Sequence, residues 1–360
     1  MVVAGPVGGV DYPRTWAEFV AWFGDDEACV AYLERLRWED GFVCPGCGST
    51  RWWPASRGVG SRVCAGCARR TSVTAGTVFA GTRSPLTQWF AAAWHVCATK
   101  NGASALGLQK LLGLGSYETA WVWLHKLRRA MVVPGRELLH GEVEVDETYV
   151  GGEEPGLRGG RARGKKALVG IAVECRGGGS GRTRLARIPD ASKLTLHGFI
   201  TTNITRQSVI LTDGWPSYAG IDQAGYGHRP VSIRASTENA SELLPRVHRV
   251  ASLLKRWLDG THQGAVQPEQ LDYYLDEFTF RFNRRDSRAR GLLFYRLLSQ
   301  AVRTQPHPYD DLVGGKTLPP AAPGATRKRL HKMWECRKDG VTGIWSEKVS
   351  EGLPESRTNV

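Results

Sequence analysis

The chain has 360 residues, with 48 Lys or Arg against 35 Asp or Glu, so its formal net charge is +13 and its pI is about 9.5. That excess of positive charge favours an anionic partner, and nucleic acid is the commonest large one. There is no signal-peptide pattern and no run of 18 apolar residues, which argues against a secreted or membrane-spanning protein and predicts a cytoplasmic one. The eight cysteines are then expected to be thiols or metal ligands rather than disulfides.

The first eighty residues predict two helices followed by a zinc ribbon. Apolar residues recur at helical spacing between Trp16 and Trp38, which indicates two short helices within residues 1–40. Residues 41–80 then carry two Cys-x-x-Cys knuckles sixteen residues apart, formed by Cys44, Cys47, Cys64 and Cys67. This spacing is typical of a closed four-thiolate zinc site, whose role is structural because it leaves no position for water. A redox pair or four unrelated thiols is the alternative.

Several arginines lie in or beside the knuckles: Arg51, Arg57, Arg62, Arg69 and Arg70. They suit contact with DNA phosphates, and they equally suit an ordinary solvated face.

Residues 85–134 predict a helical segment that contacts DNA. An apolar helix from Leu86 to Thr99 is followed by a shorter one, a glycine turn, and a last helix from Tyr117 to Met131. An apolar stripe on the last helix leaves basic residues on its sides and back, namely Lys126, Arg128 and Arg129. This pattern resembles a helix-turn-helix with a basic recognition helix, and a plain helical hairpin is the alternative.

The next domain, residues 138–305, begins with the segment GEVEVDETYVGG. Val143 and Val145 alternate with acidic residues, which predicts a strand with one buried face that ends near Asp146. A second short strand, Val209 to Thr212, delivers Asp213 in the same way. Two convergent aspartates offer the hard oxygen ligands that Mg²⁺ or Mn²⁺ prefers, whereas each alone reads as a solvated turn residue.

Three successive strands, a helix, another strand and then helices predict an α/β sheet with covered faces. A glycine-rich basic loop follows the first strand, and its Arg161 and Arg163 suit phosphate contacts, the alternative being a solvated hairpin tip. A later helix carries His248 and Lys255 on one face, two turns apart. The chain ends in a basic, proline-rich tail, residues 306–360.

Taken in order, these motifs resemble the zinc-ribbon insertion-sequence transposases with a ribonuclease-H-like core. The resemblance covers roughly residues 15–305 and rests on the zinc knuckles and on VDETYVGG, LTDGWPSY, HRVASLLKRWLDGTHQGAV and YLDEFTFRFNRR. It implies a mixed sheet flanked by helices, preceded by the zinc ribbon and the helix-turn-helix-like segment. It also implies a DDE-type enzyme that cuts and joins double-stranded DNA at element ends with two divalent metal ions.

The resemblance implies a role for each matching residue. Asp146 and Asp213 match the first two catalytic carboxylates, and Lys255 matches the basic residue that follows the triad. The third position is Glu or Asn in most such enzymes and is His248 here, which makes a DDH variant. The imidazole would ligate one ion or move a proton, and it tilts the site from Mg²⁺ toward Mn²⁺.

Two other readings stay open on the sequence alone: a DNA-binding protein with an inactive core, and a nuclease that does not join strands. A transposase would work as a homo-oligomer on paired ends and associate with the nucleoid. If His248 were only a surface residue, Glu238 or Glu242 would be the candidate third ligand.

Overall fold

The computed structural model describes residues 5–56, 60–133, 135–151, 166–231, 243–264 and 266–313. Arg57, the loop with Arg161 and Arg163, both alternative glutamates and nearly all of the predicted tail lie outside these residues. The described part belongs to one compact unit, residues 1–319. None of its helices is both long and apolar enough to cross a membrane.

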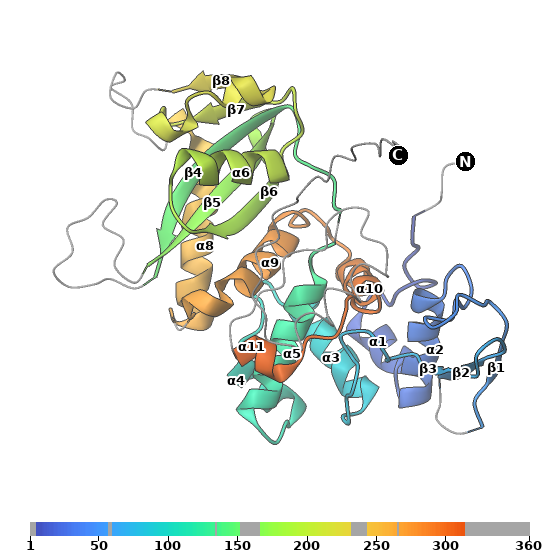
Figure 1. Cartoon of the computed structure of the whole chain (residues 1–360). Helices are drawn as coiled ribbons and strands as arrows, with labels where there is room; N and C mark the ends of the chain where they lie inside the picture. Colours follow the sequence, from blue (N-terminus) through green and yellow to red (C-terminus); the bar gives the residue numbers. More distant parts are fainter. Residues whose placement is uncertain are drawn as a thin grey trace, which may run out of the picture. The chain divides into compact units, whose positions relative to one another are not determined.

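The N-terminal half of this unit is a group of helices with a small sheet inserted among them (Figure 1). The elements in chain order are α1 (Trp16–Trp22), α2 (Asp26–Arg37), β1 (Trp52–Pro54), β2 (Ser61–Cys64), β3 (Arg70–Ser72), α3 (Leu86–Ala98), α4 (Ala105–Leu112) and α5 (Tyr117–Ala130). Side-chain caps begin four of the helices: Thr15, Asp25, Ser104 and Ser116 each accept a hydrogen bond from a backbone N–H of the first turn. The helical pattern in this region is therefore confirmed.

The second half is built on one five-stranded sheet. Its strands are β4 (Glu142–Val150), β5 (Ala167–Arg176), β6 (Gly179–Ile188), β7 (Val209–Thr212) and β8 (Gly227–Pro230), in the order β6-β5-β4-β7-β8. The strands β4, β5 and β6 are antiparallel neighbours, while β7 runs parallel to β4 and β8 parallel to β7. This topology is the ribonuclease-H-like mixed sheet that the sequence predicts.

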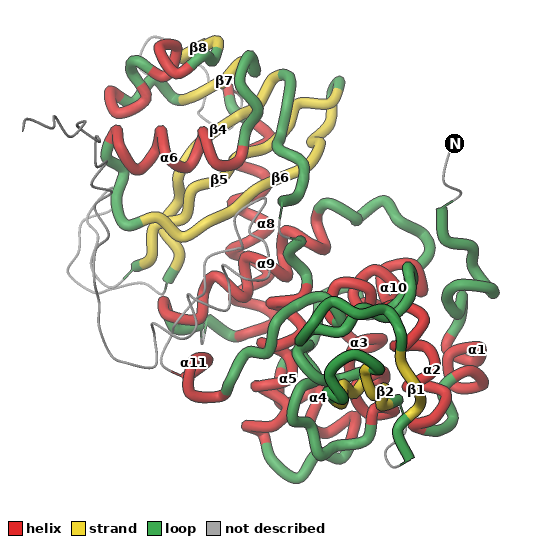
Figure 2. The backbone as a smooth tube through the Cα atoms, turned by 45° about the vertical axis from the view of Figure 1, so that its right-hand side comes forward, coloured by secondary structure: helices red, strands yellow, loops and turns green. Residues whose placement is uncertain are grey.

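Helices cover both faces of the sheet (Figure 2). One face carries α6 (Lys193–Asn203), and the other carries α8 (Pro245–His262) and α9 (Leu271–Phe282). Since β5 is buried on both faces, its sequence ALVGIAVE reads as a continuous apolar run rather than an alternating one. Three short 3₁₀ turns, Pro216–Tyr218, Ile221–Ala224 and Pro268–Gln270, connect the elements.

One strand boundary differs from the prediction. β4 does not end near Asp146, because residues 147–150 continue to pair with residues 167–170 of β5. Polar residues there interrupt the apolar alternation, while the backbone ladder continues regardless of side-chain type.

The last two helices among the described residues are α10 (Arg290–Ala301) and α11 (Tyr309–Val313). Although α10 falls within the range predicted for the sheet domain, its apolar face packs against α3, α2 and α5. Gly291 also lets α10 lie against the segment before α1, because a Cβ there would lie 1.7 Å from the carbonyl oxygen of Pro13. The domain bounds stay predictions.

Candidate functional site

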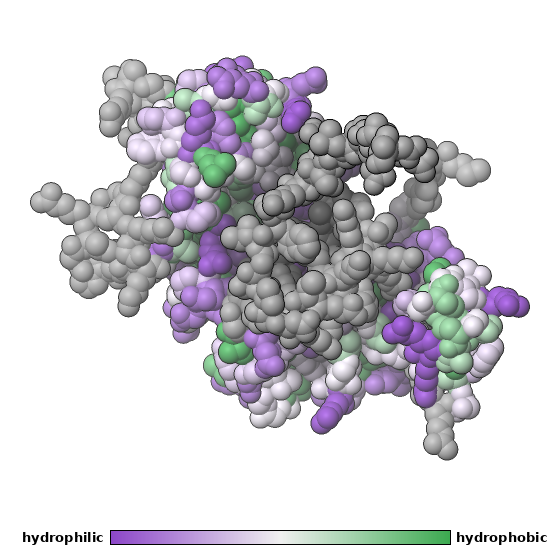
Figure 3. All heavy atoms as spheres, in the orientation of Figure 1, coloured by the Kyte–Doolittle hydropathy of each residue, from purple (hydrophilic) through white to green (hydrophobic). Residues whose placement is uncertain are grey.

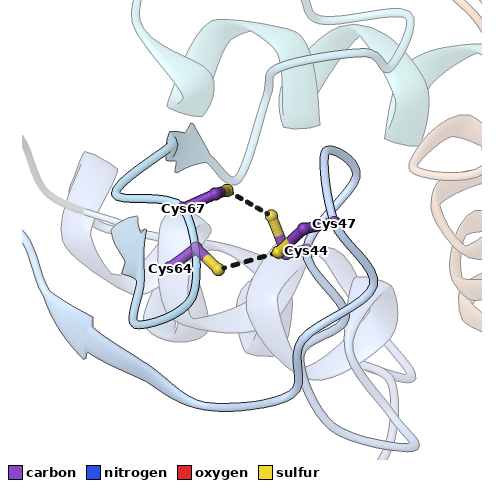
Figure 4. A group of neighbouring side chains, drawn as sticks. All are labelled: Cys44, Cys47, Cys64 and Cys67. Carbon is purple, nitrogen blue, oxygen red and sulfur yellow. Dashed lines mark hydrogen bonds between the residues drawn. The ribbon is translucent and has the colours of Figure 1, made fainter.

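The four knuckle cysteines meet at one point beside the three-stranded sheet (Figure 4). The Sγ atoms of Cys44 and Cys67 are 3.6 Å apart, and those of Cys47 and Cys64 are 3.5 Å apart. All four sulfur atoms lie within 4.8 Å of one another. Four thiolates at about 2.3 Å from a tetrahedral zinc ion are roughly 3.8 Å apart. The donor set and its spacing therefore fit one structural zinc ion.

The arginines near this cluster do not all face solvent. The Arg62 guanidinium lies between two indole rings, 3.9 Å from the centre of Trp38 and 4.0 Å from that of Trp52. Only 14% of its side chain is exposed, and burial lowers its pKa. Arg62 thus helps to pack the ribbon rather than offering its charge to DNA. The zinc ribbon also exposes apolar side chains, since Val43 and Trp53 are each 48% exposed. Figure 3 shows apolar surface on the right-hand side of the view.

The register of β4 and β7 places Asp146 and Asp213 side by side. The parallel pairing aligns Glu142 with Val209 and Glu144 with Leu211, so two residues further on the same alignment brings Asp146 next to Asp213. Adjacent strands are about 4.8 Å apart, and equivalent positions share one face of the sheet. The alignment therefore puts both aspartates on the same face of the sheet, where β7 ends. The backbone N–H of Trp215 donates to Asp213 Oδ1 at 3.0 Å, which orients that carboxylate.

His248 joins the aspartates from the first turns of α8. Its Nε2 lies 3.9 Å from Asp146 Oδ2, and the side chains are 32% and 19% exposed, respectively. The Nε2 atom is buried and has no hydrogen-bond partner among the described residues. Burial lowers the pKa of His248, although Glu144 and Asp213 oppose the shift. A neutral imidazole with an unsatisfied nitrogen is the form that ligates a metal.

These three residues form a looser group than the cysteines do. In the described part of the chain, only the cysteine quartet brings three or more His, Cys, Asp or Glu ligand atoms within 4.8 Å of one another. Lys255 is exposed on α8, seven residues after His248 and about 10 Å further along the helix. The candidate site thus consists of two carboxylates and an imidazole, donors that suit a divalent cation, and Lys255 lies about two turns further along α8.

A third acid, Glu147, follows Asp146 directly on β4, and no sequence pattern singles it out. Glu147 accepts a hydrogen bond at 2.8 Å from the hydroxyl of Tyr218, which is fully buried under the α6 face. Burial and the nearby Glu147 carboxylate raise the pKa of Tyr218 well above its usual value. The tyrosine therefore stays protonated and fixes the strand directly after Asp146. No sequence signal pairs residues 71 positions apart.

The prediction that Arg128 contacts DNA is wrong, because this side chain is buried. Arg128 is only 2% exposed, and its Nε forms an ion pair at 2.8 Å with Glu277 Oε2 on α9, which is completely buried. Its guanidinium also lies 4.1 Å from the centre of the Tyr274 ring. Because the back of α5 packs on α9, the Arg128 charge, which the apolar stripe predicts to face solvent, is buried inside the protein.

The other two basic residues of α5, Lys126 and Arg129, are half-buried. Lys126 lines a pocket of about 470 Å³ together with Arg83, Ser84, Trp89 and Tyr309. Burial lowers the pKa of Lys126. These two cations stay candidates for DNA contact, and the pocket marks where α5 reaches the surface.

Two protein-family models match this chain, one over the sheet domain and one over the zinc ribbon. The ISXO2-like transposase domain matches residues 138–283, and the transposase zinc-ribbon domain matches residues 24–70. No curated protein matches the chain.

Similar solved structures include the Mos1 strand transfer complex, with 15% identity, coverage of 64% of this chain and 79% of that chain, and a TM-score of 0.26. A pre-cleavage Mos1 transpososome has 12% identity, coverage of 64% of this chain and 79% of that chain, and a TM-score of 0.25. A Mos1 transposase paired-end complex with left transposon end has 14% identity, coverage of 54% of this chain and 76% of that chain, and a TM-score of 0.22.

Proposed function

Because this chain belongs to the zinc-ribbon insertion-sequence transposases and is a DNA transposase, we propose that it cuts and joins DNA at the edge formed by Asp146, Asp213 and His248. One observation carries the proposal. The β4–β7 alignment, continued by two residues, puts Asp146 and Asp213 on one face of the sheet, and the first turns of α8 bring His248 Nε2 to 3.9 Å from Asp146 Oδ2. Solvated turn aspartates have no reason to meet in this way.

Asp146, Asp213 and His248 would hold the divalent ions. When bound, such ions activate an attacking water or 3′ hydroxyl and stabilise the leaving oxygen of the phosphodiester. The fit rests on the unsatisfied Nε2 of His248 and on its 3.9 Å approach to Asp146. An N,O,O donor set suits Mn²⁺ at least as well as Mg²⁺.

The chain's own cations orient the DNA. Lys255 is exposed on the same helix as His248 and would contact a phosphate of the reacting strand. Lys126 and Arg129, with Arg161 and Arg163 of the glycine-rich loop, would supply further phosphate contacts. Two such chains on paired ends would account for a homo-oligomer.

The test is cleavage of a duplex that carries an element end, with Mg²⁺ or Mn²⁺ and with added target DNA. Asp146→Asn, Asp213→Asn and His248→Gln are each expected to lower cleavage by at least about 100-fold while end binding changes little, since they remove metal ligands and not phosphate contacts. Asp222→Asn, an exposed carboxylate of the same domain, is the matched control and should cleave at the wild-type rate.

The outcomes separate the three readings of the sequence. Binding without any nicking by the wild-type protein would indicate an inactive core, and nicking without joined products would indicate a nuclease. Wild-type rates from His248→Gln would remove the histidine from the site and return Glu238 or Glu242 as the third ligand.

A further inference from the structure

A buried glutamate connects the strand of Asp146 to the helix of His248. Glu144 lies two residues before Asp146 on the same face of β4, and it is 1% exposed. Its Oε2 accepts hydrogen bonds from the backbone N–H groups of Arg246 at 2.7 Å and Val247 at 2.8 Å. Its Oε1 pairs with the Arg246 guanidinium at 2.8 Å. One carboxylate therefore closes the first turn of α8.

Helix α8 has no cap of its own. Leu244 stands at the N-cap position and makes no side-chain cap hydrogen bond, and Pro245 begins the helix without an N–H. The first N–H groups of a helix need acceptors, and the partial positive charge there favours an anion. Glu144 supplies both the acceptor and the negative charge from strand β4. It therefore caps α8 and also fixes the start of the helix relative to the sheet.

Arg246 extends the connection to a second point. Its Nε donates to the carbonyl of Gly179 at 2.9 Å and its Nη2 to that of Gly177 at 2.7 Å, in the turn between β5 and β6. The hydrogen bond to Glu144 raises the pKa of Arg246, which keeps the guanidinium charged. The next residue after the capped pair is His248, whose Nε2 faces Asp146.

We propose that Glu144 is a positioning residue of the active site, which sets the distance between His248 and Asp146 by anchoring α8 to β4. The proposal rests on the proposed function, because it assigns Glu144 its role through His248. A misplacement of about 1 Å at a reacting centre costs about 100-fold in rate. Losing the anchor should therefore slow cleavage far more than it weakens DNA binding.

The chain offers a matched control in Glu174 on β5. Like Glu144, it is 1% exposed and accepts from two backbone N–H groups, those of His140 at 3.2 Å and Arg182 at 3.1 Å. It also pairs with an arginine, Arg182, at 2.6 Å. Its bonds reach β6 and the start of β4 rather than α8. Glu174→Gln thus removes a comparable buried charge without touching the helix of His248.

The experiment compares Glu144→Gln with Glu174→Gln in full-length protein. Cleavage of the end-containing duplex with Mn²⁺ should fall about 100-fold in kcat for Glu144→Gln, with KM for DNA within about twofold. Glu174→Gln should keep the wild-type kcat. The second readout needs neither metal nor DNA: in protein labelled at the histidine ring carbons, the NMR signal of His248, identified by its loss in His248→Gln, should move in Glu144→Gln only.

Either readout can overturn the proposal. An unmoved His248 signal in Glu144→Gln would show that the glutamate does not position the ring, and equal kcat losses in the two variants would assign both to general destabilisation. If Glu144→Gln fails to fold, Glu144→Asp, whose shorter side chain falls short of the α8 N–H groups, takes its place in both measurements. Absence of cleavage by the wild type would refute the proposed function, while the NMR comparison would still decide whether Glu144 positions His248.

Discussion

The buried ion pair between Arg128 and Glu277 gives the sharpest test of how α5 is used. If Arg128 faced DNA, Arg128→Met would weaken end binding and leave the fold intact. In the structure, the same change removes the 2.8 Å partner of a carboxylate that is completely buried. Arg281 cannot take over, because its Nη1 is 3.9 Å from Glu277 Oε1, too far for a good hydrogen bond.

The expected loss follows from that geometry. Removing one partner of a buried ion pair costs about 3–5 kcal/mol of unfolding free energy, because the other charge stays desolvated. The contact of Arg128 with the Tyr274 ring is lost as well. For a unit of this size the unfolding entropy is roughly 0.6 kcal/mol/K, so the melting temperature should fall by about 5–8 °C. Salt does not screen a pair at this depth, so the loss should be the same in low and high salt.

The assay is thermal unfolding of Arg128→Met beside Lys110→Met, an exposed cation on α4 that should change stability by no more than about 0.5 kcal/mol. A double variant, Arg128→Met with Glu277→Leu, should regain much of the loss, since apolar side chains of similar volume replace a buried pair at little cost. A wild-type melting temperature for Arg128→Met, together with weaker DNA binding, would refute the reasoning and place the guanidinium at the DNA.

Three further predictions concern other parts of the chain. Metal analysis should find about one zinc per chain, and Cys64→Ser should lose it, whereas full retention would disprove the four-cysteine site. Lys126→Ala should weaken end binding and reduce the slope of log K against log salt by about one, and an unchanged slope would mean that Lys126 makes no phosphate contact. Burial, with Arg128, His262 and His307 nearby, lowers the pKa of His125 to about 2, so below about pH 6.5 the ring is neutral in the folded state and protonated in the unfolded state. The contribution of His125 to stability is therefore full above the unfolded pKa of about 6.5 and is lost as the pH falls. His125→Phe should make the melting temperature decline less between about pH 6 and pH 4. An unaltered decline would show that His125 is not the group responsible.

The sequence predicts local features of this protein well. The cysteine spacing identifies all four zinc ligands, because tetrahedral ligation demands knuckles of that length. The helices α3 and α5 follow from apolar periodicity within a few residues of their ends. The order of three strands, a helix and a strand is enough to predict an α/β sheet with covered faces, and the family resemblance implies that the sheet is mixed.

Long-range pairing is what the sequence does not carry. Arg128 and Glu277 are 149 residues apart, and nothing on α5 distinguishes an arginine with a buried partner from one that faces water. The contacts of Glu144 with α8 span more than 100 residues and use backbone N–H groups, which have no sequence signature at all. Likewise, α10 packs on α3 because both expose apolar stripes, and such stripes are too alike to name their partners.

The placement of the two aspartates shows how much depends on a single register. Val143 and Val145 point to the α6 face of the sheet, so Glu144 and Asp146 point to the α8 face. On β7, Ile210 is buried against the same α6 cluster, so Leu211 and Asp213 share the face of Asp146. A slip of one residue in either strand would put one carboxylate on the wrong side and the apolar residues in water. The burial of Val143, Val145 and Ile210 therefore determines which face of the sheet carries both aspartates, and this is the face on which His248 approaches Asp146. The packing of the core thus sets the geometry of the proposed site.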